Sequence, residues 1–358
     1  MKRSDSRVSP ARRVAFEILQ RVASGAYASE LLARTAGLDA RDAGLATEIV
    51  FGCLRYQAQL DYMIGRLTNN RKLDTAVQIV LRMGMYQLRY LERIPPHAAV
   101  SESVELIKSS KASAAALVNA VMRKVNRQPV RWPDRAAELS CPAWLLESWD
   151  RQYGREAADN IAQAFLQTPA NYVASTGRTQ DIGAQSIVPL LDLKEGETFL
   201  DLCAAPGNKT AQAIERGAHA FACDLHLHRL RALNDLSCRR IALDATQPLP
   251  FTTKFHAVLV DAPCSGTGTL ARNPEIKWRL KPRDLPELQT KQQAILRNAL
   301  DHVQPGGRVL YSTCSLEREE NENVIAAFPG NWVVHRRLPG KDPGDGFFAA
   351  VRKIDMAL

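Results

Sequence analysis

The apolar residues in the first third of the chain follow the repeat of an α-helix. In residues 10–25, Val14, Ile18, Leu19 and Val22 share one helical face, between a proline at the start and a glycine at the end. Both residues are favoured at those ends of a helix. The same pattern continues in residues 73–94, 96–110 and 111–127. We therefore predict an all-α domain over residues 1–127.

From about residue 183 the pattern changes to short runs of consecutive apolar residues, most of them separated by helical stretches. Such runs are typical of parallel strands that are buried on both faces of a sheet. In chain order the candidate strands read TFLDLC, AFACD, RIALD, AVLVD, RVLYST, WVVH and FFAAVRKI. They predict a Rossmann-like α/β domain over residues 179–358, with a doubly wound, mostly parallel seven-stranded sheet.

Residues 128–178 separate these two domains. They contain several tryptophans and prolines and one helical segment, at residues 156–167. A segment with so few apolar positions has little room for a core of its own, so we interpret it as a connector.

The charge of the chain is concentrated in the helical domain. The 358 residues include 47 lysines and arginines against 38 acidic residues, a net charge of +9. Residues 1–127 hold 20 of the basic and 11 of the acidic residues, whereas residues 128–358 hold 27 of each. Such an excess in one domain favours binding to a polyanion, most simply nucleic acid. A solvated basic surface without a partner is the alternative.

The remaining composition excludes several classes of protein. No apolar run approaches the ~20 residues of a membrane-spanning helix, and the charged N-terminus lacks the apolar segment of a secretory signal. We expect a cytoplasmic protein with no membrane partner. The seven cysteines form no CxxC pair and the histidines complete no zinc pattern, so we expect free thiols and no metal. For Cys53, Cys141 and Cys238 a buried apolar role is the simplest interpretation.

The first candidate site is the loop between the strand TFLDLC and the following helix. Its small residues and the helix start would let a ligand approach the backbone. The loop is not a Walker A motif, because Asn208 precedes Lys209 and Cys203 stands where the first glycine is needed. It is not a dinucleotide loop either, because Gly207 is its only glycine.

Acidic residues end four successive candidate strands, at Asp201, Asp224, Asp244 and Asp261. An acid at the end of the second strand of such a sheet typically binds a ribose diol, although any one of the four could instead cap its own turn. A pocket that binds ribose but has no phosphate cradle suits S-adenosylmethionine.

The second candidate site contains Cys264 and Cys314. Each follows a candidate strand at the edge where open α/β sheets bind ligands. A thiolate that adds to C6 of a pyrimidine makes C5 nucleophilic toward a methyl donor, and a second thiol can assist release. Asp261 could bind the N3/N4 edge of cytosine and stabilise the developing charge. Enzymes that methylate an exocyclic amine carry Asp-Pro-Pro-aromatic here, whereas this chain has Asp-Ala-Pro-Cys, which favours methylation of carbon.

These motifs resemble those of the Sun family of RNA cytosine-5 methyltransferases. The resemblance covers about residues 180–358, through DLCAAPGNKT, VLVDAPCSGTGTLARNPEIKW, LYSTCSLEREEN and DGFF. The helical domain is similar to the NusB-like domain of the RsmB branch, through RDAGLATEIVFGCLRYQ, LRMGMYQLRYLERIPPHAAVSESVELIK and LVNAVMRKV. The resemblance implies a class I methyltransferase fold, S-adenosylmethionine as cofactor, small-subunit (16S) rRNA as substrate, and a monomer.

The resemblance also implies roles for individual residues. Cys314 matches the family's nucleophile and Cys264 the cysteine for product release, beside Asp261. The positions that match the cofactor site are Cys203, Ala204, Ala205, Pro206, Gly207, Asn208, Lys209, Asp224, Asp244 and Asp261. Lys277 and Trp278 match a segment near the base pocket. Arg272 and Arg279 could contact phosphates there or lie on a solvated helix face.

Two features depart from the family pattern. Asn208 replaces a glycine, which adds a side chain at a tight turn, although asparagine tolerates left-handed backbone angles. The RNA-binding subdomain between the two domains is also reduced, so the basic helical domain would contribute more to RNA selection. Two alternatives remain open: a tRNA cytosine-5 methyltransferase, and a non-catalytic NusB-like RNA-binding factor, against which the paired thiols argue.

Overall fold

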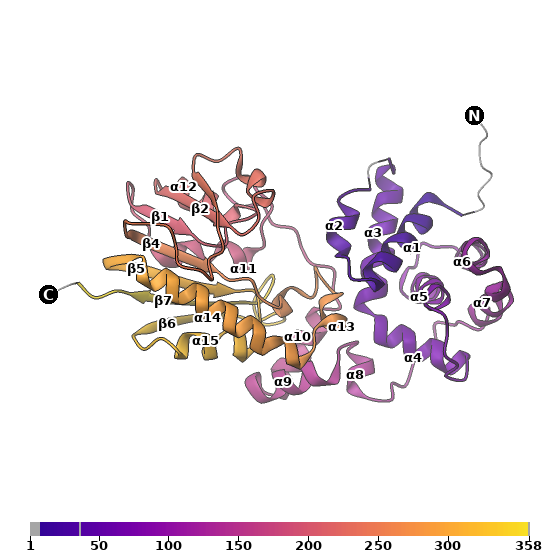
Figure 1. Ribbon diagram of the computed structural model, residues 1–358. Helices are drawn as coiled ribbons and strands as arrows, with labels where there is room; N and C mark the ends of the chain where they lie inside the picture. Colours follow the sequence, from indigo (N-terminus) through magenta and orange to yellow (C-terminus); the bar gives the residue numbers. More distant parts are fainter. Residues whose placement is uncertain (1–7, 36, 357–358) are drawn as a thin grey trace. The chain divides into compact units, whose positions relative to one another are not determined.

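The computed structural model describes residues 8–35 and 37–356, and these divide into two compact units (Figure 1). The helical unit comprises the chain up to Leu146 together with Ala271–Trp278. The sheet unit comprises Glu147–Leu270 and the chain from Arg279 onward. The division thus falls inside the predicted connector, and one short segment from the second half of the sequence packs with the helices.

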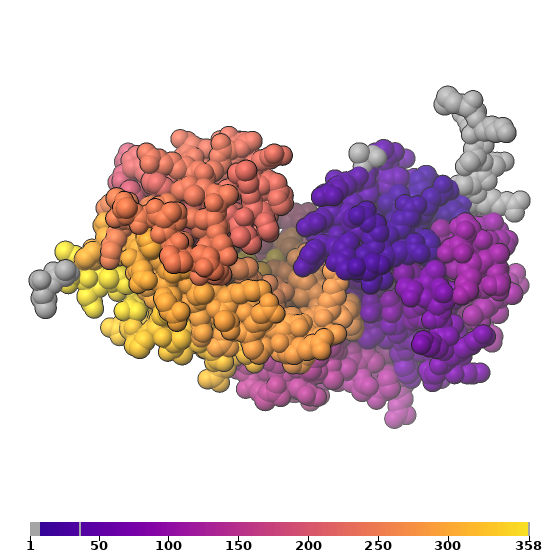
Figure 2. Space-filling model, viewed as in Figure 1, coloured from indigo at the N-terminus to yellow at the C-terminus, as the bar shows by residue number. Residues whose placement is uncertain are grey.

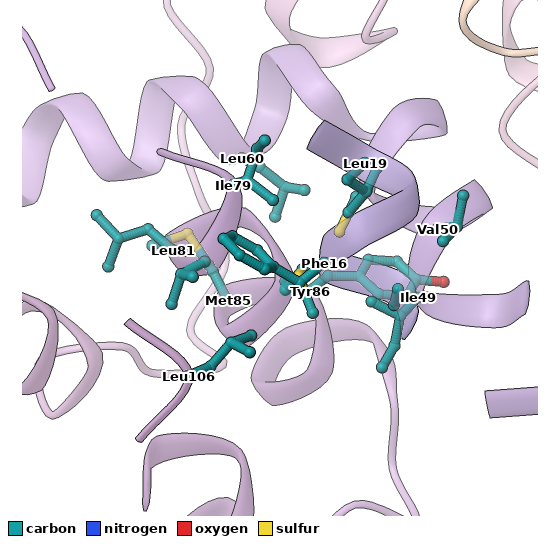
Figure 3. Packing of buried hydrophobic residues seen from close by; sticks show 14 of the residues in the cluster. Phe16, Leu19, Ile49, Val50, Leu60, Ile79, Leu81, Met85, Tyr86 and Leu106 are labelled. Carbon is teal, nitrogen blue, oxygen red and sulfur yellow. The ribbon is translucent and has the colours of Figure 1, made fainter. Parts of the chain in front are cut away.

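The helical unit confirms the helical pattern of the sequence. Its helices are α1 (Pro10–Ala23), α2 (Ala28–Leu32), α3 (Ala40–Arg55), α4 (Gln57–Leu67), α5 (Thr75–Tyr90), α6 (Pro96–Lys111), α7 (Ala115–Met122), α8 (Arg135–Glu138), the first residues of α9 (Ala143–Tyr153), and most of α13 (Ile276–Arg279). Side chains from α1, α3, α5 and α6 meet in one core, where Phe16, Ile49, Met85 and Leu106 lie together (Figure 3).

A buried polar network joins three of these helices. The guanidinium of Arg12, on α1, donates from Nε to Gln87 Oε1 at 2.7 Å and from Nη1 to Glu102 Oε1 at 2.8 Å. Gln87 is on α5 and Glu102 on α6. Because the three polar groups satisfy one another, their burial does not leave an unpaired charge in the core.

The sheet unit confirms the predicted doubly wound sheet. Its strands are β1 (Thr198–Asp201), β2 (His219–Asp224), β3 (Arg239–Ala242), β4 (Phe255–Asp261), β5 (Val303–Thr313), β6 (Trp332–Arg337) and β7 (Phe347–Lys353). Their order is β3-β2-β1-β4-β5-β7-β6. The first five are parallel, and β7 lies antiparallel between β5 and β6.

Alternate residues of the central strands enter two separate cores, one on each face of the sheet. Leu200 and Val258 pack in the core that α14 (Leu285–Asp301) covers, together with α15 (Glu322–Ala326). Figure 1 shows α14 along the near side of the sheet, and in Figure 2, seen from the same side, orange residues from this part of the chain form the near surface of the sheet unit. Phe199 packs on the other face, in the core that includes side chains of α11 (Ile182–Gln185) and α12 (Asn208–Glu215). Burial on both faces explains why these strands are apolar throughout.

The remaining helices of the sheet unit are the end of α9 and α10 (Arg155–Ala164). Trp149 of α9 is fully buried and its ring lies 5.9 Å from that of Phe165, just after α10. These two helices therefore pack as a pair within the sheet unit.

Candidate active site

The site lies at the carboxyl ends of three neighbouring parallel strands. β1 pairs with β4, and β4 pairs with β5 in a register that places Asp261 beside Ser312. The loops that follow these strands therefore leave the sheet at the same edge. This edge includes the reversal of strand order between β1 and β4, where doubly wound sheets bind their ligands.

The two thiols singled out in the sequence are brought into contact. Cys264 Sγ and Cys314 Sγ lie 3.4 Å apart, and both side chains are half-buried. The loops are also joined through the backbone, since Gly268 N donates to Cys314 O at 2.8 Å. A side chain at Gly268 has no room, because a Cβ would lie 2.3 Å from the carbonyl oxygen of Gly346.

The surroundings of Cys264 favour its protonated form. The hydrogen bond to Cys314 and burial together raise the pKa of the Cys264 thiol well above its usual value, and the charge of Glu320 acts in the same direction. Cys264 therefore keeps its proton at neutral pH. A protonated thiol in contact with Cys314 is placed to donate a hydrogen bond or a proton.

Asp261 forms an ion pair with the lysine of the first candidate loop. Lys209 Nζ donates to Asp261 Oδ2 at 2.6 Å, and Ser312 Oγ donates to Asp261 Oδ1 at 2.9 Å. Burial alone would lower the pKa of Lys209, but the charge of Asp261 and the hydrogen bond to it outweigh burial and raise that pKa. The ammonium group therefore stays charged and fixes the orientation of the Asp261 carboxylate.

The loop Cys203–Gly207 connects β1 to α12. Gly207 has a left-handed backbone with φ of 100°, and a Cβ there would lie 2.6 Å from Leu233 Cγ. Asn208 is instead the first residue of α12, and its Nδ2 donates to Thr179 O at 3.1 Å. The left-handed conformation of the turn thus falls on the glycine, so Asn208 does not need the backbone tolerance considered for it from the sequence.

The four strand-end carboxylates differ in their surroundings. Asp201 is buried and accepts from Thr210 Oγ1 at 2.8 Å, and burial raises its pKa to about 7. Asp224 is buried, accepts from His226 N at 3.0 Å, and pairs with Arg229 at 3.3 Å. Asp244 is exposed and accepts from Thr246 N at 2.9 Å. Asp224 and Asp244 therefore each accept a backbone hydrogen bond within the turn that follows their strand, which is the capping role considered for them from the sequence.

Lys277 and Trp278 belong to the helical unit. Lys277 is buried, and its Nζ donates to the backbone oxygen of Arg55 at 2.9 Å. The Trp278 indole donates to Leu54 O at 2.8 Å. Burial lowers the pKa of Lys277 to about 8. The structure thus places both side chains against the end of α3, and because the Lys277 ammonium is engaged there we expect it to act on stability. A role in RNA binding remains a prediction for Trp278 and for the half-buried Arg272 and Arg279.

Sequence reasoning missed the polar groups that connect the two cysteine loops. Ser265 and Ser315 directly follow the two cysteines, their hydroxyl oxygens lie 3.2 Å apart, and both donate to the carboxylate of Glu320. The available signal was the repeat of Cys-Ser after two different strands, with an acid six residues beyond the second cysteine.

The described residues also bear on disulfides, metal sites and membrane-spanning helices. None of the seven cysteines is part of a disulfide; Cys53 and Cys141 are buried and Cys238 is half-buried. Within residues 8–35 and 37–356 no group of three or more histidine, cysteine or acidic side chains is arranged to hold a metal ion. None of the helices described there has the length and apolarity to cross a bilayer.

The sheet order and the position of the site define a Rossmann-like class I methyltransferase fold joined to an all-α unit. Comparison with known proteins gives the same result. Residues 188–332 match the model of the family 16S rRNA methyltransferase RsmB/F, and residues 9–127 match the NusB family. A crystal structure of PH0851 has a TM-score of 0.77 at 20% identity, over 96% of this chain and 99% of that one, and this likeness shows the fold.

Full-length relatives identify the family. The chain is 31% identical to the probable ribosomal RNA small subunit methyltransferase B of Bacillus subtilis, over 88% of this chain and 87% of that protein. It is 32% identical to ribosomal RNA small subunit methyltransferase B of Erwinia tasmaniensis, over 87% and 90%. The chain belongs to the family of ribosomal RNA small subunit methyltransferase B.

Proposed function

We propose that this protein transfers a methyl group from S-adenosylmethionine to C5 of a cytosine in small-subunit rRNA, through a covalent adduct between Cys314 and C6. The observation that carries the proposal is the contact of the Cys264 and Cys314 sulfurs, 3.4 Å apart, beside the Asp261 carboxylate. Membership of the family supports RNA as the substrate.

The residues present fit S-adenosylmethionine. Its ribose hydroxyls need a hydrogen-bond acceptor, which Asp224 supplies at the end of β2. The cofactor carries no phosphate, which matches a site where Lys209 is already paired with Asp261. When bound, the cofactor supplies an electrophilic methyl group.

Each side chain then has a defined task. The Cys314 thiolate adds to C6, and the bond electrons move toward C5, which becomes nucleophilic. Asp261, held by Lys209 and Ser312, accepts a hydrogen bond from the N4 edge and stabilises the charge that develops on the ring. After methylation the C5 proton passes to Cys264 as that thiol gives its own proton to the departing Cys314 sulfur, and the C5–C6 double bond forms again. Cys264, protonated before this step and again after it, thus assists release of the product.

The proposal is tested with unmodified 16S rRNA that carries 5-fluorocytosine. Fluorine at C5 blocks the final elimination, so a protein–RNA adduct should survive denaturation when S-adenosylmethionine is present. We expect the adduct with the wild type, with Cys264→Ala and with the control Cys238→Ala, and no adduct with Cys314→Ala. An adduct that forms only with a tRNA pool would overturn the assignment of rRNA as the substrate. No adduct with either RNA, despite bound cofactor, would favour a non-catalytic RNA-binding factor.

A further inference from the structure

A fully buried carboxylate connects the two cysteine loops. Glu320 is 0% exposed and ends a short 3₁₀ turn, Arg318–Glu320. Its Oε1 accepts from Ser265 N at 2.7 Å and from Gln292 Nε2 at 2.9 Å. Its Oε2 accepts from Ser315 Oγ at 2.5 Å and from Ser265 Oγ. A carboxylate can only accept, and here its two oxygens receive four donors.

The donors come from the residues that determine where the thiols lie. Ser265 follows Cys264 directly, and Ser315 follows Cys314 directly. Gln292 Nε2 also donates to Pro263 O at 3.0 Å, so it contacts the residue before Cys264 as well. One carboxylate therefore holds both loops at positions adjacent to the sulfur atoms.

Glu320 is itself held rigidly. The hydroxyl of Tyr311, which is buried in the core of the sheet, donates to Glu320 O at 2.6 Å. The next residue, Asn321, accepts from Thr313 Oγ1 at 2.6 Å and donates to Ser315 O at 2.9 Å. These bonds tie the turn to the end of β5, so the carboxylate has a fixed position relative to the strand that carries Cys314.

We infer that Glu320 is a positioning residue that sets the distance between the Cys264 and Cys314 thiols; this inference rests on the proposed function. Burying a charge is costly unless hydrogen-bond donors surround it. Two loops could be held together without a buried charge, so the carboxylate indicates a more specific role. A short, charge-assisted acceptor that receives donors from both loops confines their spacing more tightly than neutral hydrogen bonds would. The negative charge also adds to the effects that keep Cys264 protonated.

The test compares Glu320→Ala, Glu320→Gln and, as a matched control, Glu319→Gln, the half-buried acid one residue earlier. We expect Glu320→Ala to lower kcat by about 10- to 100-fold, the loss typical of small misplacements of reacting groups. The KM for RNA and the Kd for S-adenosylmethionine should stay within about twofold, since neither depends on the thiol spacing. The adduct on 5-fluorocytosine RNA should form correspondingly more slowly.

Glu320→Gln should rescue part of the activity, with a kcat between those of Glu320→Ala and the wild type, because neutral hydrogen bonds replace the charge-assisted ones. Its amide oxygen can face Ser265 N and Gln292, and its amide nitrogen can donate to the two serine hydroxyls, which also accept. Equal kcat losses in Glu320→Gln and Glu320→Ala would overturn positioning by shared hydrogen bonds, and so would a loss in Glu319→Gln as large as that in Glu320→Ala.

A second measurement does not depend on RNA chemistry. Diamide oxidises two neighbouring thiols to a disulfide and is itself reduced to the hydrazine, and peptide mapping identifies the Cys264–Cys314 product. In the protein without RNA we expect this disulfide to form at least about fivefold more slowly in Glu320→Ala than in the wild type, because the effective concentration of one thiol at the other is smaller. In Glu319→Gln it should form at the wild-type rate. Equal rates in a folded Glu320→Ala protein would overturn the inference.

Two further controls separate the possible failures. If Glu320→Ala does not fold, as judged by its thermal unfolding, the pair Ser265→Ala and Ser315→Ala replaces it, because each removes one hydroxyl donor and leaves the carboxylate. Unchanged disulfide rates in both serine variants would then overturn the inference. If the wild type methylates no RNA but the disulfide rates follow the expected order, the proposed function fails and the positioning by Glu320 stands.

Discussion

Lys209 Nζ lies 2.6 Å from Asp261 Oδ2, and this ion pair joins the first turn of α12 to the end of β4. It connects the two sites that the sequence suggested separately: the cofactor loop and the carboxylate beside the thiols. The lysine is largely buried, with 11% of its side chain exposed, so the pair is shielded from solvent more than a surface ion pair.

Replacement of this lysine should impair catalysis more than folding. Lys209→Met removes the charge that orients Asp261, and we expect kcat for methyl transfer to fall by about 10²-fold. The matched control is Lys291→Met on α14, where an exposed lysine pairs with Glu287. Steady-state methylation of RNA measures both variants, and a Lys209→Met enzyme within twofold of the wild type would contradict a role for the ion pair.

The turn before α12 should tolerate no side chain. In Gly207→Ala the new Cβ would combine a left-handed φ of 100° with a contact 2.6 Å from Leu233 Cγ. We expect a loss of about 2 kcal/mol in the free energy of unfolding and weaker binding of S-adenosylmethionine. Gly177→Ala has a similar φ of 74° but no atom within 4 Å of the Cβ, so it reports the backbone strain alone. Equal losses of stability in the two variants, measured by urea unfolding, would contradict the steric argument.

Glu317 should make the stability of the sheet unit depend on pH. Burial raises its pKa from about 4.5 to about 7, although Trp149 and Ser148 donate to its carboxylate at 3.0 Å. The folded state therefore binds this proton more tightly than the unfolded state. The contribution is fully present below pH ~4.5 and is lost as the pH rises through ~7, by an amount on the order of 3 kcal/mol.

Glu317→Gln should accordingly reduce the decline of the free energy of unfolding between pH 5 and pH 8. Asp201, whose pKa is also raised to about 7 by burial, contributes a decline of the same sign and should remain in the variant. Urea unfolding of both proteins at several pH values provides the measurement. A pH profile that the substitution leaves unchanged would show that Glu317 does not titrate in this range.

Lys277 should act on stability and not on RNA affinity. Its pKa is lowered to about 8 by burial and by Arg55. The unfolded state then binds more protons, so stability should rise with pH from ~8 toward ~10.5, and Lys277→Met should flatten this rise. Because Lys277 Nζ donates a hydrogen bond to Arg55 O, we expect the KM for RNA in Lys277→Met to stay within twofold of the wild-type value. A tenfold increase in KM would instead support a contact between Lys277 and RNA.

Much of the sheet unit could be predicted because the signals are local. A strand buried on both faces must be apolar throughout, which marks β1 and β4, and the loops after parallel strands must share an edge. The proximity of Cys264 and Cys314 follows from these two rules. The insertion of β7 between β5 and β6 does not, because the pairing of two antiparallel edge strands leaves no distinct pattern in either one.

The sequence by itself determined the all-α first domain, the seven strands, the strand-end carboxylates and the two loops that carry thiols, because periodicity and motif spacing are properties of a few consecutive residues. Only the tertiary structure decided which polar groups meet: Lys209 with Asp261, Lys277 with the end of α3, and Glu320 with both serines. The physical reason is that burial and hydrogen bonding depend on where side chains from distant parts of the chain converge. Ser265 and Glu320, 55 positions apart in the sequence, are an example.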